Sequence, residues 1–138
     1  MANPVPGRRI STPFKAKGKM WKFGYHTGVD YKCPTGTDIC AATDGKVLEV
    51  GSVSWGPSYG TAIVVDHGNG FRAIYAHLSK VLVKKGQKIK TGQHIGEAGS
   101  TGNSSGPHLH FEVRVAPFRY APQCFVDPAV LISKKAGA

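Results

Sequence analysis

Long apolar runs are missing from this 138-residue sequence. The longest of them, such as residues 61–65, hold about five residues, whereas a membrane-spanning helix needs roughly 20. Residues 1–7 also lack the apolar segment of a secretory leader. We therefore expect no transmembrane segment and no signal peptide, and predict synthesis in the cytoplasm of a host cell.

Cysteine is scarce as well. The chain has only Cys33, Cys40 and Cys124, an odd number without any C-x-x-C pair, and this excludes a zinc-finger framework. The sequence leaves two states open for Cys33 and Cys40, which are a disulfide bridge and free buried thiols.

Acidic residues are few, since 8 of them face 18 lysines and arginines, and the formal net charge is +10. Such an excess predicts anionic partners but says nothing about the fold. Nucleic acid, anionic membranes and anionic cell-wall polymers are the candidates, and a solvated basic face is the alternative. Because few aromatic residues interleave with the basic clusters at 8–22 and 80–90, we expect no specific nucleic-acid partner.

The length corresponds to one domain of ordinary size. Residues 1–21 contain basic residues, proline and glycine but no acidic residue, which favours an extended arm over a helix. The predicted organisation is this basic arm, a main domain over residues 22–132 and a short tail over residues 133–138, in a monomer.

Helical periodicity is weak along the whole chain, and only one helical turn is expected, near residues 127–131. Alternation of apolar and polar residues, which is typical of strands, is common instead. The segments that alternate or are rich in β-branched residues are 45–53, 61–66, 71–78, 81–92 and 108–115. An Asn-Gly pair at 69–70 separates two of them and predicts a β-hairpin. The fold class predicted from these patterns is all-β, a single small antiparallel domain.

Histidine is frequent, with six residues placed unevenly along the chain. His26 and Asp30 have Gly28 between them and can converge on one point if the chain bends. His108 and His110 share one face of a predicted strand, because residues two apart point to the same side. The plain interpretations of the two groups are a surface turn and a polar sheet face.

A catalytic zinc site uses three protein ligands and keeps a fourth position for water. His26, Asp30 and one of His108 and His110 supply that number. No H-E-x-x-H helix is present, so a histidine has to act as the general base, and imidazole titrates in a suitable range. The candidates are the remaining histidine of the pair and His77, and spacing does not decide which of His108 and His110 is the ligand.

The H-x-G-x-D motif at 26–30 and the H-L-H-F-E motif at 108–112 resemble those of the lysostaphin-like zinc metalloendopeptidase family, which cuts the peptides of bacterial peptidoglycan. The resemblance covers residues 22–132. Further segments in family order are 34–37, 42–47, 66–70, 75–79, 86–89 and 99–102. This resemblance implies a small antiparallel β domain with an open groove across its sheet.

The resemblance also implies roles for individual residues. His26, Asp30 and His110 would bind one zinc ion, and His108 would be the general base. His77 would stabilise the oxyanion or protonate the leaving amine. The implied activity is zinc-dependent hydrolysis of cross-bridge or stem peptides in peptidoglycan, with the particular bond left open.

The alternative is a non-catalytic cell-wall-binding or hydrolase-activating module of the same fold. Relatives of that kind have lost ligands, whereas this chain keeps all five residues, and this favours an enzyme. The expected setting is a phage lysin that reaches the wall through a membrane lesion or inside the virion. A truncated secreted bacterial enzyme would have the same sequence features.

Several other side chains have expected roles. Trp55, Tyr59 and Tyr75 are the predicted substrate contacts, and the loop around Trp55 is the expected source of selectivity. Glu112 shares the face of the H-x-H pair, so it either orients an imidazole or is a plain surface carboxylate. His67 is expected to cap the hairpin turn.

Overall fold

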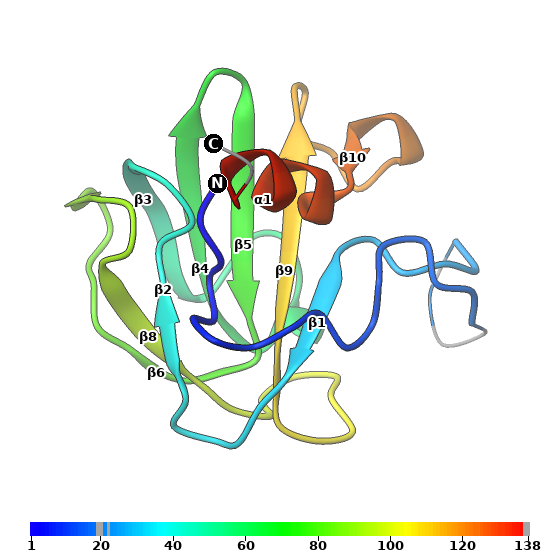
Figure 1. Cartoon of the computed structure of the whole chain (residues 1–138), viewed down its shortest axis with the longest axis horizontal. Coiled ribbons are helices and arrows are strands. Elements are labelled where there is room, and N and C mark those ends of the chain that lie inside the picture. Colours follow the sequence, from blue (N-terminus) through cyan, green and yellow to red (C-terminus); the bar gives the residue numbers. More distant parts are fainter. Residues whose placement is uncertain (19–20, 22, 137–138) are drawn as a thin grey trace.

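Two antiparallel β-sheets form the body of the computed structural model, which describes residues 1–18, 21 and 23–136 (Figure 1). The larger sheet has the spatial order β1 (Val29–Lys32), β9 (His108–Val115), β5 (Phe71–Ala76), β4 (Thr61–Gly68), β3 (Gly45–Ser52) and β7 (Lys88–Ile89), and β10 (Phe125–Val126) pairs with β9. The smaller sheet has the order β2 (Asp38–Cys40), β8 (His94–Ala98) and β6 (Leu78–Val81). The predicted all-β antiparallel fold is confirmed.

The predicted hairpin is formed by β4 and β5, which pair with Ile63 opposite Tyr75. Asn69 in its turn has a left-handed backbone (φ 53), as the Asn-Gly pair predicts. The second strand of the hairpin is shorter than predicted, because it ends at Ala76 and the chain bends at His77 before β6 begins.

Side chains on the larger sheet alternate between two faces. One face carries the main core, whose fully buried members include Ile63, Tyr75 and Phe111. The opposite face carries a smaller apolar cluster that contains Val64 and Ile74. Burying one large apolar side chain stabilises the fold by about 1.5–3 kcal/mol. The residues of each strand that enter the main core are therefore fixed by this burial, and their neighbours in the strand point to the opposite face of the sheet.

Two short strands, β1 and β2, lie where no strand was predicted. They contain 4 and 3 residues, which is too few to show a clear alternation. Conversely, the alternating segment 81–92 contributes only the last residue of β6 and the two residues of β7.

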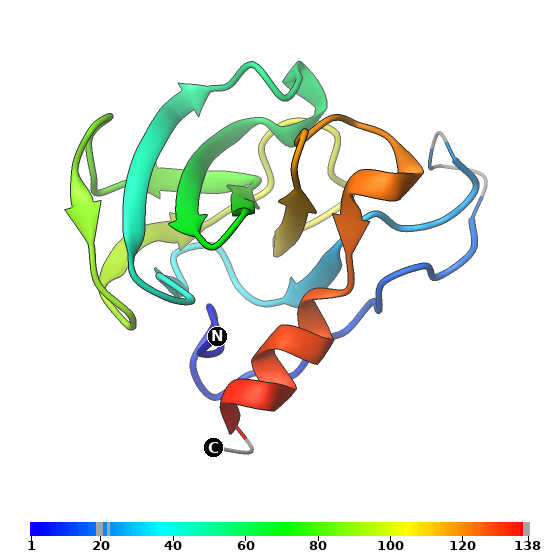
Figure 2. The same cartoon turned by 90° about the horizontal axis from the view of Figure 1, so that it is seen from above.

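The helix near the C-terminus is longer than the single turn that was predicted. It is α1 (Pro128–Ala136), seen as the red coil in Figure 2. Its start is well defined, since Asp127 Oδ1 accepts the Ala129 N–H at 2.9 Å and proline occupies the first helical position. Two 3-10 helices also occur, η1 (Pro57–Tyr59) and η2 (Pro122–Cys124). No helix among the described residues has the length and apolar character to span a bilayer.

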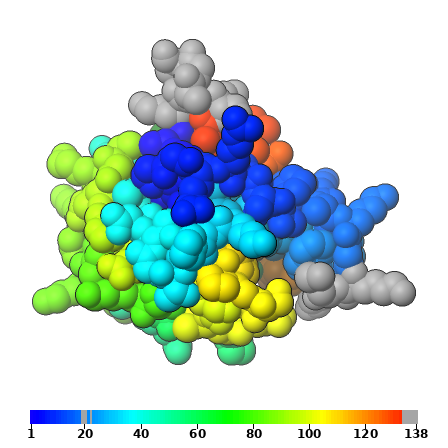
Figure 3. All heavy atoms as spheres, turned by 60° about the horizontal axis from the view of Figure 1, so that its bottom comes forward, coloured from blue at the N-terminus to red at the C-terminus, as the bar shows by residue number. Residues whose placement is uncertain are grey.

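The N-terminal residues pack onto the sheets, and Figure 3 shows them (blue) against the segment coloured cyan. Val5 is fully buried in the main core, and the Cys40 N–H donates to the Pro4 carbonyl oxygen at 2.8 Å. The boundaries predicted for an arm at 1–21 and a tail at 133–138 stay predictions. Parts of both lie outside the described residues, namely Lys19 and Met20 of the arm and Gly137 and Ala138 of the tail.

Cys33, Cys40 and Cys124 are free thiols, and all three are buried. Of the two states that the sequence leaves open for Cys33 and Cys40, the structure therefore contains the reduced one. Burial raises the pKa of both of these thiols, so they are protonated at neutral pH.

Candidate metal centre and groove

Strands β1 and β9 bring the two histidine motifs together. Asp30 on β1 lies opposite His110 on β9 in antiparallel register, and His26 precedes β1. A side chain at Gly28 would place its Cβ 2.5 Å from the Phe111 carbonyl oxygen. Glycine at this position therefore lets the first motif approach β9 closely enough for the three side chains to meet.

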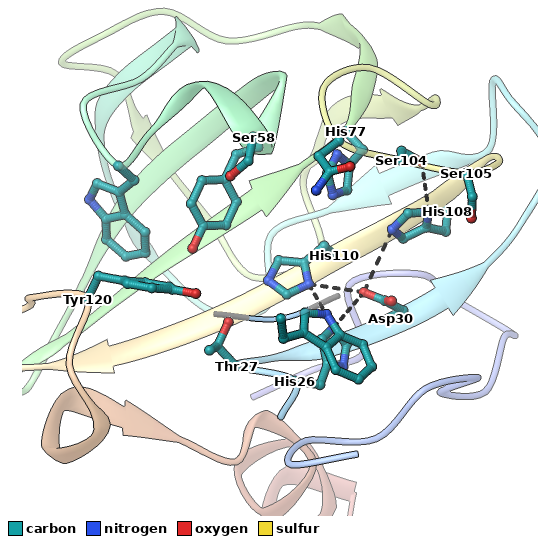
Figure 4. A pocket seen from close by; sticks show the side chains of 14 residues that line it. His26, Thr27, Asp30, Ser58, His77, Ser104, Ser105, His108, His110 and Tyr120 are labelled. Carbon is teal, nitrogen blue, oxygen red and sulfur yellow. Dashed lines mark hydrogen bonds and ion pairs between the residues drawn. The ribbon is translucent and has the colours of Figure 1, made fainter. Parts of the chain in front are cut away.

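His26, Asp30 and His110 converge on one point in the groove (Figure 4). His26 Nε2 lies 3.1 Å from Asp30 Oδ1, and His110 Nδ1 lies 3.0 Å from the same oxygen. The two ring nitrogens are 3.1 Å apart. The structure thus brings the predicted ligands together, whereas His108 Nε2 stays 3.8 Å from Asp30 Oδ1.

Hydrogen bonds on the far side of each ring leave one nitrogen of each ligand histidine for a metal. His26 Nδ1 donates to the Pro13 carbonyl oxygen at 3.1 Å, so the lone pair of the neutral ring is on Nε2. His110 Nε2 donates to Glu112 Oε1 at 3.0 Å, so the lone pair of its neutral ring is on Nδ1. Such outer partners fix the tautomer and the orientation of metal-binding histidines.

The charges of the cluster also suit a cation. Burial opposes a charge on His110, but hydrogen bonds to Asp30 and Glu112 outweigh it and raise the pKa of His110 to about 9. The two carboxylates thus favour a positive charge here, and a bound metal would take the place of the second proton, on Nδ1. Burial likewise opposes ionisation of Asp30, yet hydrogen bonds from His110 and His26 hold the pKa of that carboxyl well below its usual range. Two imidazole nitrogens and one ionised carboxylate are typical zinc ligands, so these residues fit a divalent metal.

His77 and His108 lie beside the ligands, with their ring centroids 4.7 Å apart. His77 Nδ1 donates to the Thr101 carbonyl oxygen at 2.6 Å, and His108 Nδ1 donates to the Gly106 carbonyl oxygen at 2.8 Å. The Nε2 atom of each neutral ring is therefore a proton acceptor. Burial lowers the pKa of His77 to about 4. His77 also has a left-handed backbone (φ 62), which is uncommon for non-glycine residues and recurs at functional sites.

Two loops pack against each other next to His77. A Cβ on Gly102 would lie 2.4 Å from the backbone nitrogen of Gly60, so the two glycine backbones are in direct contact. The Asn103 N–H also donates to the Ser58 carbonyl oxygen at 2.9 Å. The loop that precedes β4 and the loop that follows β8 therefore form one packed unit.

Glu112 is fully buried and is bound by three groups besides His110. The Thr27 hydroxyl donates to it at 2.6 Å, the Tyr59 hydroxyl at 2.9 Å and Arg114 Nε at 2.8 Å. Burial opposes its ionisation, but the hydrogen bond from His110 outweighs it and lowers the pKa of Glu112. Of the two roles considered for Glu112, orientation of an imidazole is confirmed, and the surface carboxylate is excluded.

Arg114 is a residue of this site that the sequence did not single out. Its side chain is buried, its guanidinium lies 3.8 Å from the centre of the Trp55 ring, and Nη2 donates to the Tyr59 hydroxyl at 3.1 Å. Alternation along β9 already put Arg114 on the face of His110. The burial of Arg114 was not predicted, because the sequence does not show that the loop around Trp55 covers this face.

Aromatic rings line an open groove of about 640 Å³ around the ligands. Trp55 and Tyr59, two of the predicted substrate contacts, are among them, and so are Trp21 and Tyr120, which were not among those predicted contacts. Trp21 stacks on the ring of His26 with a centroid distance of 4.9 Å. The groove therefore has aromatic walls near the metal ligands.

Tyr75 belongs to the main core and His67 is buried beside it, and these positions correct two predictions. The Tyr75 hydroxyl donates to His67 Nε2 at 2.9 Å and accepts the Ala42 N–H at 2.9 Å, while His67 Nδ1 donates to the Asp44 carbonyl oxygen at 3.0 Å. Tyr75 does not contact the groove, because strand alternation turns it to the core face, opposite to Ile74. His67 does not cap the hairpin turn, because its ring is buried between these partners.

A second group of possible ligands, formed by Asp38, His94 and Glu97, lies on the smaller sheet. His94 Nε2 and Asp38 Oδ1 are 3.2 Å apart, and their side chains are 39% and 68% exposed. An ordinary solvent-exposed polar contact explains this arrangement, in contrast to the buried and oriented rings of His26 and His110.

A β fold that presents a cluster of oriented ligand atoms to an open groove, beside two proton-accepting imidazoles, defines a metal-dependent hydrolase. Comparison of the sequence with family models narrows this class. The model of peptidase family M23 matches residues 24–122, and the chain belongs to this family of metallopeptidases.

Known proteins agree with this assignment. The peptidoglycan DD-endopeptidase ShyA of Vibrio cholerae is 46% identical over 90 residues, which cover 65% of this chain and 20% of ShyA. The catalytic domain of lysostaphin from Staphylococcus simulans superposes with a TM-score of 0.83 at 32% identity, covering 96% of this chain and 99% of that domain. A zinc-containing peptidase from Vibrio cholerae has a TM-score of 0.74 at 39% identity, covering 90% of this chain and 37% of the other. The chain thus spans about a fifth of the length of ShyA.

Proposed function

We propose that this protein is a zinc-dependent endopeptidase that cuts the peptides of bacterial peptidoglycan. The observation that carries the proposal is the pair of ligand histidines whose tautomers are fixed toward Asp30 at the floor of an open groove. Relatives named as a peptidoglycan DD-endopeptidase and as a zinc-containing peptidase support the substrate and the metal. The D,D cross-link between stem peptides is the first bond to test.

His26 Nε2, Asp30 Oδ1 and His110 Nδ1 would hold one zinc ion. When bound, such an ion lowers the pKa of a water molecule toward 7 and polarises a carbonyl group. Glu112 contributes by keeping the proton of His110 on Nε2, which leaves Nδ1 available. Pro13 contributes in the same way through its carbonyl oxygen on His26.

We assign the proton acceptor of the reaction to His108. Its Nδ1 proton is held by the Gly106 carbonyl oxygen, so Nε2 is available to take a proton from the attacking water. His77 has the same tautomer, and its pKa of about 4 makes it a weak base. Nε2 of its neutral ring carries no proton, so His77 can stabilise the oxyanion or protonate the leaving amine only after it takes up a proton, such as the one that His108 removes from the attacking water.

The groove suits an extended peptide, with Trp55 and Tyr59 as substrate contacts. The net charge of +10 supports retention on anionic cell-wall polymers, an attraction that salt weakens. A monomer that acts as a phage lysin, and its route from a host cytoplasm to the wall, stay predictions.

Digestion of purified peptidoglycan tests the proposal. We expect soluble fragments whose masses correspond to hydrolysis of one kind of peptide bond, complete inhibition by a chelator and recovery on addition of zinc. A protein that binds peptidoglycan and releases no fragments in the presence of zinc would be the non-catalytic module, and the proposal would be wrong.

A further inference from the structure

Residues 11–16 lie before the part of the chain that the family model matches, yet they contact two of the three ligands. We infer that these residues, here called the ligand clamp, are a positioning element of the metal centre. The inference rests on the proposed function only in taking His26 and Asp30 as metal ligands. It assigns a role at the metal to the segment that the sequence alone presents as a basic arm.

The ligand clamp covers the outer side of β1 at Asp30. The Asp30 N–H donates to the Thr12 carbonyl oxygen at 2.9 Å, and the Asp30 carbonyl oxygen accepts the Ser11 N–H at 2.8 Å. The Ser11 hydroxyl accepts the Lys32 N–H at 2.9 Å. Since β9 pairs with the other side of β1, the clamp and β9 hold the backbone of Asp30 between them.

The same segment holds His26 at three atoms. The His26 N–H donates to the Ala16 carbonyl oxygen at 2.8 Å, and the His26 carbonyl oxygen accepts the Lys15 N–H at 2.8 Å. The ring donates from Nδ1 to the Pro13 carbonyl oxygen at 3.1 Å. Backbone position, ring orientation and tautomer of this ligand are therefore all determined by the clamp.

A tight turn positions the Pro13 carbonyl oxygen. The Ala16 N–H donates to that oxygen at 3.3 Å, and Lys15 has a left-handed backbone (φ 62). This conformation is costly for lysine, whose side chain is exposed and has its Nζ 5.8 Å from the Phe14 ring and 5.7 Å from the Tyr25 ring. The turn therefore retains strain while it directs a carbonyl group at a metal ligand, as strained residues at functional sites do.

Two substitutions at Lys15 form a matched test, because both remove the same exposed charge. Lys15→Gly accepts the left-handed backbone, whereas Lys15→Val disfavours it and should displace the Pro13 carbonyl. We expect Lys15→Val to bind zinc about 10- to 100-fold more weakly than Lys15→Gly in competition with a chromophoric chelator. Long-range ¹⁵N–¹H NMR of the metal-free proteins should show the Nδ1–H tautomer of His26 in Lys15→Gly and its loss in Lys15→Val.

A control and a second variant complete the experiment. Asn69→Val places the same side chain at another left-handed position (φ 53), in the β4–β5 turn, and should lower the melting temperature without changing zinc affinity. Insertion of one glycine between Thr12 and Pro13 should shift the carbonyl out of register and weaken zinc binding as Lys15→Val does. The inference is wrong if Lys15→Val or the insertion binds zinc as tightly as the native chain. These measurements use no substrate, so failure to cut peptidoglycan would count against the proposed function alone.

Discussion

Two buried histidines on opposite faces of the larger sheet, His67 and His110, differ in what surrounds them. His67 contacts a backbone carbonyl and the Tyr75 hydroxyl, and burial lowers its pKa. His110 contacts two carboxylates, which raise its pKa to about 9 against the effect of burial. Burial is similar and the partners differ, so the partners decide whether a buried imidazole is a neutral core residue or a site for a cation.

Removal of Asp30 is expected to have the largest effect on the difference between His110 and His67. Asp30→Ala takes away one ligand and one of the two carboxylates around His110, so that His110 keeps only Glu112. We expect the bound zinc to fall from about one ion per chain to nearly none, as elemental analysis of purified protein would show, and peptidoglycan cleavage to be lost with it. Asp66→Ala, in β4 outside the groove, is the control and should retain the metal. Full zinc occupancy of Asp30→Ala would contradict the ligand assignment.

His77 sharpens the contrast, because its pKa is lowered as that of His67 is, yet it lines the groove. We expect His77→Ala to keep its zinc and to reduce turnover by about 10²- to 10³-fold, since an imidazole proposed to stabilise the oxyanion or protonate the leaving amine is lost. Paired measurements of metal content and turnover would check this. A variant that loses its metal, or that cleaves at the native rate, would show that His77 has another role.

Exchanging the partner charge tests the contrast at Glu112. Glu112→Gln keeps the size of the side chain but removes the charge that holds the His110 proton on Nε2 and pairs with Arg114. We expect zinc affinity to fall about 10- to 100-fold. Tyr75→Phe makes a comparable change beside His67 and should leave zinc affinity unchanged, with a loss of about 1 kcal/mol in the free energy of unfolding. Equal zinc affinities in the two variants would show that the partners of His110 matter no more for zinc binding than those of His67.

The pH dependence of stability should have opposite signs for the two histidines in chelator-treated protein. The raised pKa of His110 stabilises the fold below about pH 6.5, and this contribution is lost as the pH rises through about 9. The lowered pKa of His67 has the reverse effect, so that its contribution is present above about pH 6.5 and is lost as the pH falls. Urea unfolding across this range should show the loss on the alkaline side disappear in His110→Asn. A loss that persists in this variant would assign the alkaline step to another group.

The sequence predicts the hairpin, the strand β9 and the convergence of two motifs well, because each depends on local pattern or spacing. It does not distinguish His108 from His110, because that depends on which residue of β9 lies opposite Asp30, a register set by pairing with β1. The prediction of Tyr75 as a substrate contact is wrong for a related reason, since packing of the core decides which residues of β5 face away from the groove. The buried state of Arg114 and the contacts of residues 11–16 arise from segments distant in the sequence, which no local pattern reveals.

The contact between Gly60 and Gly102 has a consequence for protein engineering. Exchanging the loop around Trp55 for that of a relative is an obvious route to a new cleavage preference. Because that loop rests backbone to backbone on the segment after β8, and this segment supplies the Thr101 carbonyl that orients His77, a graft of one loop alone would disturb the position of His77. The two loops form a single exchangeable cassette and should be transplanted together.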